Sequence, residues 1–244
     1  MKAIILTSQR SGSTFLGRCL DAHPSIESRG ELLVGGEVVA PRPLRGRRTL
    51  TKLYRYAAVR AWDPVSIIER CYEREEAPVV VFRAMYNHVD NRPVRAYFRA
   101  HKEIRVIHLR RDNLLKQHVS KLLLGAKRER SWQPHTDHKI PVASVKVSAK
   151  RAIEDMQRVR DNFIEFERLL SAHRKVELVY ERMYNGQTLS HEAWVKLAEL
   201  LEIEPAKLAA DLVKMNPDEL RPMVTNYDEL AAALAGTEFE RFLD

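Results

Sequence analysis

Short apolar runs alternate with amphipathic stretches along this chain. The first run, Lys2–Leu6, is followed by small polar residues with a tight loop at Gly12, and then by a helical pattern over residues 13–22. Three later runs are typical of buried strands: residues 79–82, 104–109 and 176–180. The spacing of apolar residues predicts further helices, from a cap at Asp112 or Asn113 to Leu124, and over residues 147–173, 190–201, 205–214 and 226–235.

Strands separated by helices predict an α/β fold with a parallel sheet covered by helices on both faces. Ligands of such sheets bind at the carboxyl ends of the strands, and the loops at Arg10 and Arg111 follow two predicted strands. With no internal repeat and no Gly/Ser-rich linker, residues 1–244 are expected to form a single domain. The polar stretch 125–146 is longer than most loops, which predicts a lid or acceptor-binding loop, with a plain mobile loop as the alternative.

The composition excludes several classes of protein. The chain has 244 residues, 45% hydrophobic and 30% charged, which is ordinary for a globular protein and unlike collagen-like or disordered chains. No apolar run approaches the roughly 18 residues of a membrane helix, so no membrane insertion is expected. The two cysteines, Cys19 and Cys71, indicate a reducing compartment without a disulfide framework, and the apolar run at the N-terminus is too short for a signal peptide. Both features predict a cytoplasmic location.

The net charge of +8 is concentrated in the N-terminal half of the chain. Residues 1–130 carry 26 basic and 13 acidic side chains, which predicts an electropositive region that faces an anion. Nucleic acid, an anionic membrane and a phosphorylated nucleotide all fit this charge. The basic and aromatic segment 42–60 could bind RNA or an anionic sugar, although a solvated helix face or an acceptor-binding segment is favoured because no nucleic-acid-binding fold is recognisable.

The loop after the first strand has the composition of a phosphate cradle. Its helix would begin with exposed backbone N–H groups and a favourable dipole, Gly12 would permit close backbone approach, and further donors come from Arg10, Ser11, Ser13 and Thr14. The loop lacks the first Gly and the Lys of a Walker A motif, so a nucleotide triphosphatase is disfavoured. A serine-capped helix beside a solvated arginine is the alternative interpretation.

These residues resemble the sulfotransferases that use 3′-phosphoadenosine 5′-phosphosulfate (PAPS). Thr7–Leu16 is similar to their 5′-phosphosulfate loop, and Leu109–Ser120 is similar to their 3′-phosphate motif. Five further stretches resemble the family in the same order: Asp21–Pro24, Gly30–Leu33, Phe82–Tyr86, Tyr180–Met183 and Val224–Leu230. The parallels are small bacterial carbohydrate-type members, such as nodulation-factor and trehalose sulfotransferases, and the resemblance implies the P-loop-kinase-like sulfotransferase fold.

The resemblance also implies roles for individual residues. Arg10 and the Ser11–Thr14 segment would hold the 5′-phosphosulfate, with Arg10 stabilising charge on the leaving phosphate. Ser120 would bind the 3′-phosphate together with Arg111, although the family places its arginine eight residues before the serine and Arg111 lies nine before it. Arg110 is therefore the alternative to Arg111.

Transfer to a hydroxyl requires a general base, and Glu31 is the candidate because a carboxylate occupies a similar place in the trehalose enzyme. An exposed loop carboxylate is the alternative interpretation. Arg83 would contact the sulfonate or the acceptor, or else form a structural ion pair, whereas His108 is expected to be packed within its strand. No metal is expected, because His135, Asp137 and His138 match no standard ligand spacing.

The sequence therefore predicts a PAPS-dependent sulfotransferase that acts on the hydroxyl of a glycan or another small molecule, without a nucleic-acid partner. The rival hypotheses are a nucleotide-dependent kinase and a non-catalytic protein that binds nucleic acid or 3′-phosphoadenosine 5′-phosphate (PAP). Neither the identity of the acceptor nor the oligomeric state follows from the sequence.

Overall fold

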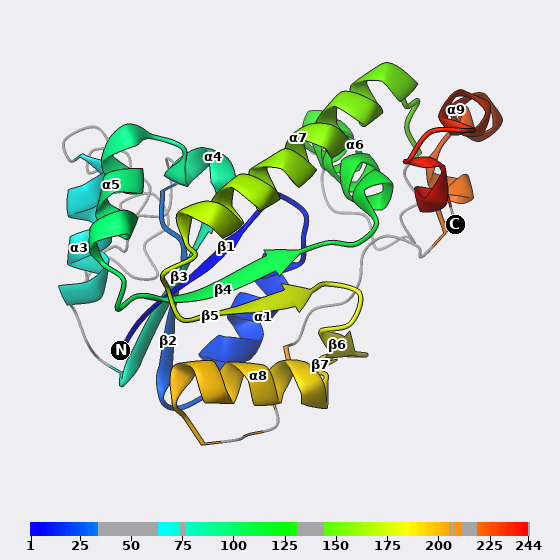
Figure 1. Cartoon of the computed structure of the whole chain (residues 1–244). Coiled ribbons are helices and arrows are strands. Elements are labelled where there is room, and N and C mark those ends of the chain that lie inside the picture. The colour runs from blue at the N-terminus through cyan, green and yellow to red at the C-terminus, as the bar shows by residue number, and fades with distance from the viewer. Residues whose placement is uncertain are drawn as a thin grey trace. The chain divides into compact units, whose positions relative to one another are not determined.

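The fold is seen in a computed structural model of the chain (Figure 1). The structure describes residues 1–33, 63–73, 77–130 (for 127–130 the backbone only), 144–204, 206, 208–210 and 219–243. The chain groups into two compact units. The first comprises Met1–Arg110 and Ile164–Leu212, and the second Arg111–Phe163 and Val213–Asp244.

A five-stranded parallel sheet forms the centre of the first unit (Figure 1). Its strands are β1 (Lys2–Thr7), β2 (Ile26–Glu31), β3 (Val79–Met85), β4 (Arg105–Arg110) and β5 (Lys175–Val179). The spatial order is β2-β3-β1-β4-β5, and every neighbouring pair is parallel. Because β1 lies in the middle of the sheet, the loop that follows it lies at the centre of the carboxyl edge, where α/β proteins bind ligands.

Helices and short elements complete the two units. The first unit contains α1 (Ser13–Asp21), α3 (Pro64–Glu73), α4 (Tyr86–Val89), α5 (Arg92–Ala100), α8 (His191–Leu201) and the hairpin of β6 (Tyr184–Asn185) and β7 (Thr188–Leu189). The second contains α6 (Leu114–Arg130), η2 (Arg221–Met223), α9 (Tyr227–Leu234) and η3 (Glu240–Phe242). Helix α7 (Ala149–Leu169) contributes to both units, because the division falls within it. Within the described residues, no helix combines the length and apolar character needed to cross a membrane.

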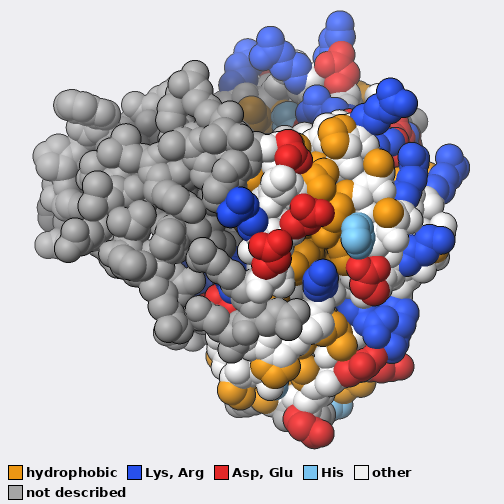
Figure 2. Space-filling model, turned by 90° about the vertical axis from the view of Figure 1, so that its left-hand side faces the viewer, with side chains coloured by type: hydrophobic (Ala, Val, Ile, Leu, Met, Phe, Trp, Pro, Cys, Tyr) orange, Lys and Arg blue, Asp and Glu red, His pale blue; other side chains and the backbone are white. Residues whose placement is uncertain are grey.

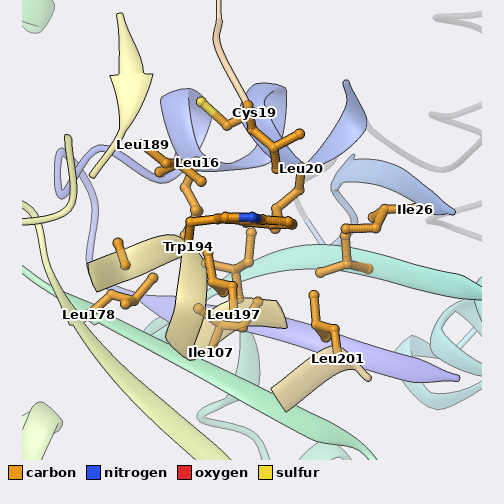
Figure 3. Close-up of a cluster of buried hydrophobic side chains, with 14 of the residues drawn as sticks. Leu16, Cys19, Leu20, Ile26, Ile107, Leu178, Leu189, Trp194, Leu197 and Leu201 are labelled. Carbon is orange, nitrogen blue, oxygen red and sulfur yellow. The ribbon is translucent and has the colours of Figure 1, made fainter. Parts of the chain in front are cut away.

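One face of the sheet is covered by α1 and α8, which meet at Trp194 (Figure 3). The Trp194 ring lies between the α1 side chains Leu16 and Leu20 and its own helix neighbour Leu197, above the strand residue Ile107. All of these residues are buried. Burial of large apolar side chains at this position fixes α1, and with it the loop that precedes α1, on the sheet.

The opposite face of the sheet contains a buried polar network. His108 is 0% exposed, and its Nε2 shares a hydrogen bond of 2.8 Å with the hydroxyl of Tyr86. Its Nδ1 lies 2.5 Å from Oε1 of Glu167. Lys175 bonds the other oxygen of Glu167, and Tyr86 stacks on Phe166. Burial lowers the pKa of His108 and raises that of Tyr86, so both are neutral at pH 7. The expectation of a packed His108 is confirmed.

The second unit has its own apolar cluster, formed by α6, α7, η2, α9 and η3. Asp155 on α7 bonds His118 and Lys121 on α6, with distances of 2.9 Å each, and Arg158 on its own helix. These contacts hold the pKa of Asp155 well below its usual range, in spite of its burial. The Asn113 side chain caps α6 by accepting from the backbone N–H of Lys116 at 2.8 Å, as predicted for one of the two candidate caps.

The α/β fold class, with its parallel sheet between helices, is confirmed, as are the four predicted strands. Two predictions are wrong. Residues 125–130 were expected in a loop but continue α6 to Arg130. The predicted helix 205–214 is not helical at 206 and 208–210, because Leu208 and Ala210 pair with the β7 region through their backbones. The remainder of the expected lid, residues 131–143, lies outside the described residues, and the single-domain expectation stays a prediction.

Candidate anion-binding site

The loop between β1 and α1 is anchored to the sheet by buried hydroxyl groups. The Thr7 hydroxyl donates to the carbonyl of Leu109 on β4 at 2.5 Å, and Thr7 Oγ1 lies 2.5 Å from Ser11 Oγ. Ser11 also donates to the Ser8 carbonyl at 2.9 Å, and both Thr7 and Ser11 are fully buried. The Ser11 hydroxyl is thus used in shaping the loop, which leaves its backbone N–H as the group suited to a ligand.

The loop backbone bends sharply at two positions. Arg10 has a φ of 64° and Gly12 a φ of 87°, both in the left-handed region. A non-glycine residue in this region is uncommon, and such strain is concentrated at functional sites. A Cβ on Gly12 would lie 2.2 Å from Cδ2 of Tyr180, the residue that follows β5. Position 12 therefore requires glycine both for its φ and for its contact with the tyrosine ring.

The N-terminus of α1 is open to an anion. Its N-cap is Gly12, and within the described part of the chain no side chain makes a capping hydrogen bond there; the first turn contains no acidic residue. The first intrahelical bond is donated by Leu16 to the Gly12 carbonyl, so the preceding N–H groups need acceptors from outside the helix. Such groups, together with the helix dipole, favour a phosphate or sulfate group.

Arg83 on β3 extends along α1 to the start of this helix. Its Nη1 donates to Thr14 Oγ1 at 2.7 Å, and its Cδ would lie 3.3 Å from a Cβ on Gly17, so the glycine gives the side chain room to pass. Its Nε is buried without a hydrogen-bond acceptor, and no carboxylate among the described residues lies within ion-pair distance of it. The alternative expectation of a structural ion pair is therefore not met within the described part of the chain.

Glu31 is the last residue of β2, and its backbone pairs with that of Arg83 on β3. The register of the two strands shifts between Ser28 and Glu31, where Gly30 has a φ of 68°. Paired residues of adjacent strands present their side chains on the same face of a sheet. Since Glu31 and Arg83 are paired near the ends of β2 and β3, the carboxylate and the guanidinium both lie at the carboxyl edge of the sheet. The Glu31 side chain is 23% exposed, which makes it accessible but partly desolvated.

The two arginines considered for a 3′-phosphate differ in their partners. Arg110 ends β4 and its Nε donates to Glu177 Oε1 at 2.6 Å. Arg111 is the first residue of the second unit, and Ser120 lies on α6 of that unit with 5% exposure. Both arginines have partners, so the choice of Arg111 rests on the sequence resemblance.

Several residues singled out in the sequence cannot be placed. Arg42–Arg60 and the histidines and aspartate of 135–138 lie outside the described residues. Within the described ranges, no group of three or more His, Cys, Asp or Glu side chains is arranged to hold a metal ion. His88, which the structure places at 3.9 Å from Glu31, was missed. No spacing in the sequence signals that pair, because it depends on the unpredicted strand β2.

Comparison with known proteins gives one informative likeness. No protein-family model matches the chain, and no curated protein matches it. Among solved structures, the sulfotransferase domain of the olefin synthase from Synechococcus PCC 7002 matches with a TM-score of 0.51 and 16% identity, over 84% of this chain and 74% of that chain. The chain shares this sulfotransferase fold. A sulfotransferase from Alicyclobacillus acidocaldarius is also similar, with a TM-score of 0.48 and 12% identity, over 100% of this chain and 96% of that chain.

Proposed function

We propose that this chain is a PAPS-dependent sulfotransferase that transfers a sulfuryl group to a hydroxyl of a carbohydrate or another small metabolite. The observation that carries the proposal is the open α1 N-terminus at the central strand, with a strained Arg10 in its loop and Arg83 directed to its first turn. The sulfotransferase fold supports it, as does the sequence resemblance of the loop to the 5′-phosphosulfate loop of that family.

The donor set of the loop fits the phosphosulfate end of PAPS. The donors are the backbone N–H groups of residues 11–14, the Thr14 hydroxyl and the guanidinium groups of Arg10 and Arg83. The first turn of α1 contains no carboxylate that would compete with an anion. Bound PAPS supplies an activated sulfuryl group on a phosphate leaving group. Charge that develops on that phosphate would be stabilised by Arg10 and the helix N-terminus.

The 3′-phosphate is assigned to Arg111 and Ser120, with Arg110 as the alternative, on the strength of the sequence resemblance. Separate substitution of the two arginines distinguishes them, because only the one that binds the 3′-phosphate should weaken the affinity for PAP.

Glu31 is proposed as the base that removes the proton of the acceptor hydroxyl. Its place at the carboxyl end of β2, in register with Arg83, supports this role, because the base and the cation then share an edge of the sheet. Glu31→Gln should lower turnover by about 10²–10⁴-fold, the usual contribution of a general base, while leaving the affinity for PAP unchanged.

The rival functions lack comparable support. A kinase of the P-loop type would need the Gly-Lys pair that the loop does not have. In the view from the side of α3 and α5, both basic and acidic side chains of the described residues surround a patch of apolar side chains (Figure 2). For the nucleic-acid-binding alternative, a recognisable nucleic-acid-binding fold is lacking in the sequence.

A thermal-shift comparison tests the proposal. PAP should stabilise the protein strongly, ATP with Mg²⁺ weakly and oligonucleotides little, because stabilisation rises with the ratio of ligand concentration to Kd. Stabilisation by ATP with Mg²⁺ and not by PAP would contradict the proposal and support the kinase. Stabilisation by PAP without transfer of labelled sulfuryl to any hydroxyl in an acceptor screen would support the non-catalytic binding protein.

A further inference from the structure

The side chain of His88, on the short helix α4, approaches the Glu31 carboxylate. His88 Nε2 lies 3.9 Å from Glu31 Oε1, and the exposed fractions of the two side chains are 10% and 23%. This separation exceeds a hydrogen bond, as is common for catalytic contacts before a substrate binds. A rotation of the carboxylate, which is the more exposed partner, would close it.

The backbone around His88 determines which ring nitrogen carries the proton. The backbone N–H of Met85 donates to His88 Nδ1 at 3.2 Å, so Nδ1 is an acceptor and the proton of the neutral ring lies on Nε2. The helix is held in this arrangement by Asn91, whose Nδ2 donates to the His88 carbonyl at 3.1 Å. The nitrogen nearest Glu31 is therefore a donor.

Burial lowers the pKa of His88, so the ring is neutral at pH 7 and is not an ion-pair partner. Among the described residues, Glu31 is the charged side chain within ion-pair distance of the ring. A neutral donor beside a carboxylate stabilises the ionised form of the carboxylate and fixes its orientation. Unlike a cation, it does not neutralise the negative charge that a general base needs.

We propose that His88 is the positioning residue of Glu31, holding the carboxylate ionised and directed toward the acceptor hydroxyl through its Nε2–H. This role rests on the proposed function, because it assigns to Glu31 the proton of the acceptor. When the hydroxyl oxygen bonds to sulfur and the sulfur–phosphate oxygen bond breaks, the proton passes to Glu31, and the phosphate leaves with the electron pair. The His88 ring keeps its proton throughout.

Nitrogen-15 NMR of the full-length protein tests the contact without any ligand. The His88 shifts should report the Nε2–H form. In Glu31→Gln the pKa of His88 should fall by about 0.7 units or more, the effect of removing a unit charge about 4 Å away even in a water-like dielectric. His101, which pairs with Glu103 at 2.9 Å, is the internal control and should not shift. An Nδ1–H form, or an unchanged pKa of His88, would overturn the proposal.

Two substitutions test the consequence for catalysis, using the hydroxyl acceptor found by screening with labelled PAPS. His88→Leu should lower kcat about tenfold or more, the scale of outer-shell effects, with Kd for PAP unchanged. His88→Gln, which can place an amide N–H near the original Nε2, should recover most of the loss. Full activity of His88→Leu, or a loss that His88→Gln does not relieve, contradicts a positioning role. Failure of the wild-type protein to bind PAP would instead count against the proposed function, and the NMR result distinguishes the two.

Discussion

Arg83 differs from other arginines of the first unit in its partners. Arg95, Arg105 and Arg110 each bond a carboxylate, whereas Arg83 donates to the neutral hydroxyl of Thr14. A partly buried guanidinium without a counter-ion among the described residues is costly unless another anion neutralises it. The position of Arg83 beside the open α1 terminus therefore favours an anionic ligand.

Substitution of Arg83 by Met should separate catalysis from stability. Turnover should fall by about 10²–10³-fold, the usual cost of removing a donor that stabilises developing charge. The free energy of unfolding should change by about 1 kcal/mol or less, because the lost hydrogen bond to Thr14 is offset by removal of a partly buried charge that has no counter-ion among the described residues. Steady-state kinetics and urea denaturation measure the two effects. Arg95→Met, which removes a cation paired with Asp90 and Glu165, is the matched control and should leave turnover unchanged.

The buried His108 should make stability depend on pH. Its pKa lies below the ordinary value of 6.5 in the folded protein, so the unfolded chain binds a proton first as the pH falls. The free energy of unfolding should therefore decrease as the pH falls from 6.5 toward the folded pKa, and it should be constant with respect to this group above 6.5. His88, whose pKa is also lowered by burial, adds to the same slope.

Urea denaturation at pH 7.5, 6.5 and 5.5 measures this slope. His108→Gln should be less stable at every pH, because it disrupts the bonds to Tyr86 and Glu167, but its stability should depend less on pH. An equal slope in the wild type and His108→Gln would show that His108 is not the titrating group.

At the scale of elements, the loop between β1 and α1 depends on Gly12. Gly12→Ala should cost about 1–2 kcal/mol for the left-handed backbone. Overpacking against Tyr180 should add about 1–3 kcal/mol. Because the loop would have to move, the affinity for PAP should fall as well. Gly186→Ala is the control: its φ is 62°, but nothing lies within 4 Å of an added Cβ, so it should show the backbone cost alone and bind PAP normally. Denaturation and calorimetry measure both; equal effects of the two variants would contradict the role of the loop.

The same scale shows why some elements could be predicted and others could not. Strands β1, β3 and β4 are largely buried on both faces, so they appear in the sequence as apolar runs. Strand β5 lies at one sheet edge and is only partly buried, but Val176, Leu178 and Val179 still mark it as an apolar run. Strand β2 lies at the other sheet edge and contains Glu27, Arg29 and Glu31, a pattern that no apolar run reveals. The predicted helix 205–214 has helical composition, yet the backbone bonds of Leu208 and Ala210 to the β7 region override that local preference at the described positions.

Site residues follow the same division. The phosphate-type loop is local, so its small residues and Gly12 could be identified from their order along the chain. The contacts Arg83–Thr14 and Glu31–His88 join residues 69 and 57 positions apart, and both depend on the register of β2, β3 and α1. Such pairs can be found only in the folded chain.

At the scale of the whole molecule, four arginines of the proposed nucleotide site account for part of the net charge of +8. Arg10 and Arg111 lie in the segments that follow β1 and β4. Arg110 is the last residue of β4, and Arg83 lies near the carboxyl end of β3. The segment 42–60 lies outside the described residues and is not needed for the proposed nucleotide site, so an acceptor-binding segment and a solvated helix face both stay open for it. The fold class could thus be predicted from the alternation of strands and helices, whereas the grouping into two units could not, because no linker marks it.

Calorimetric titration of the whole protein with PAP tests the central claim most directly. The account predicts one PAP site per chain, with ADP, which lacks the 3′-phosphate, binding at least about tenfold more weakly because charge-assisted hydrogen bonds are lost. Absence of PAP binding, or equal affinities for PAP and ADP, would contradict the assignment of this chain as a PAPS-dependent sulfotransferase.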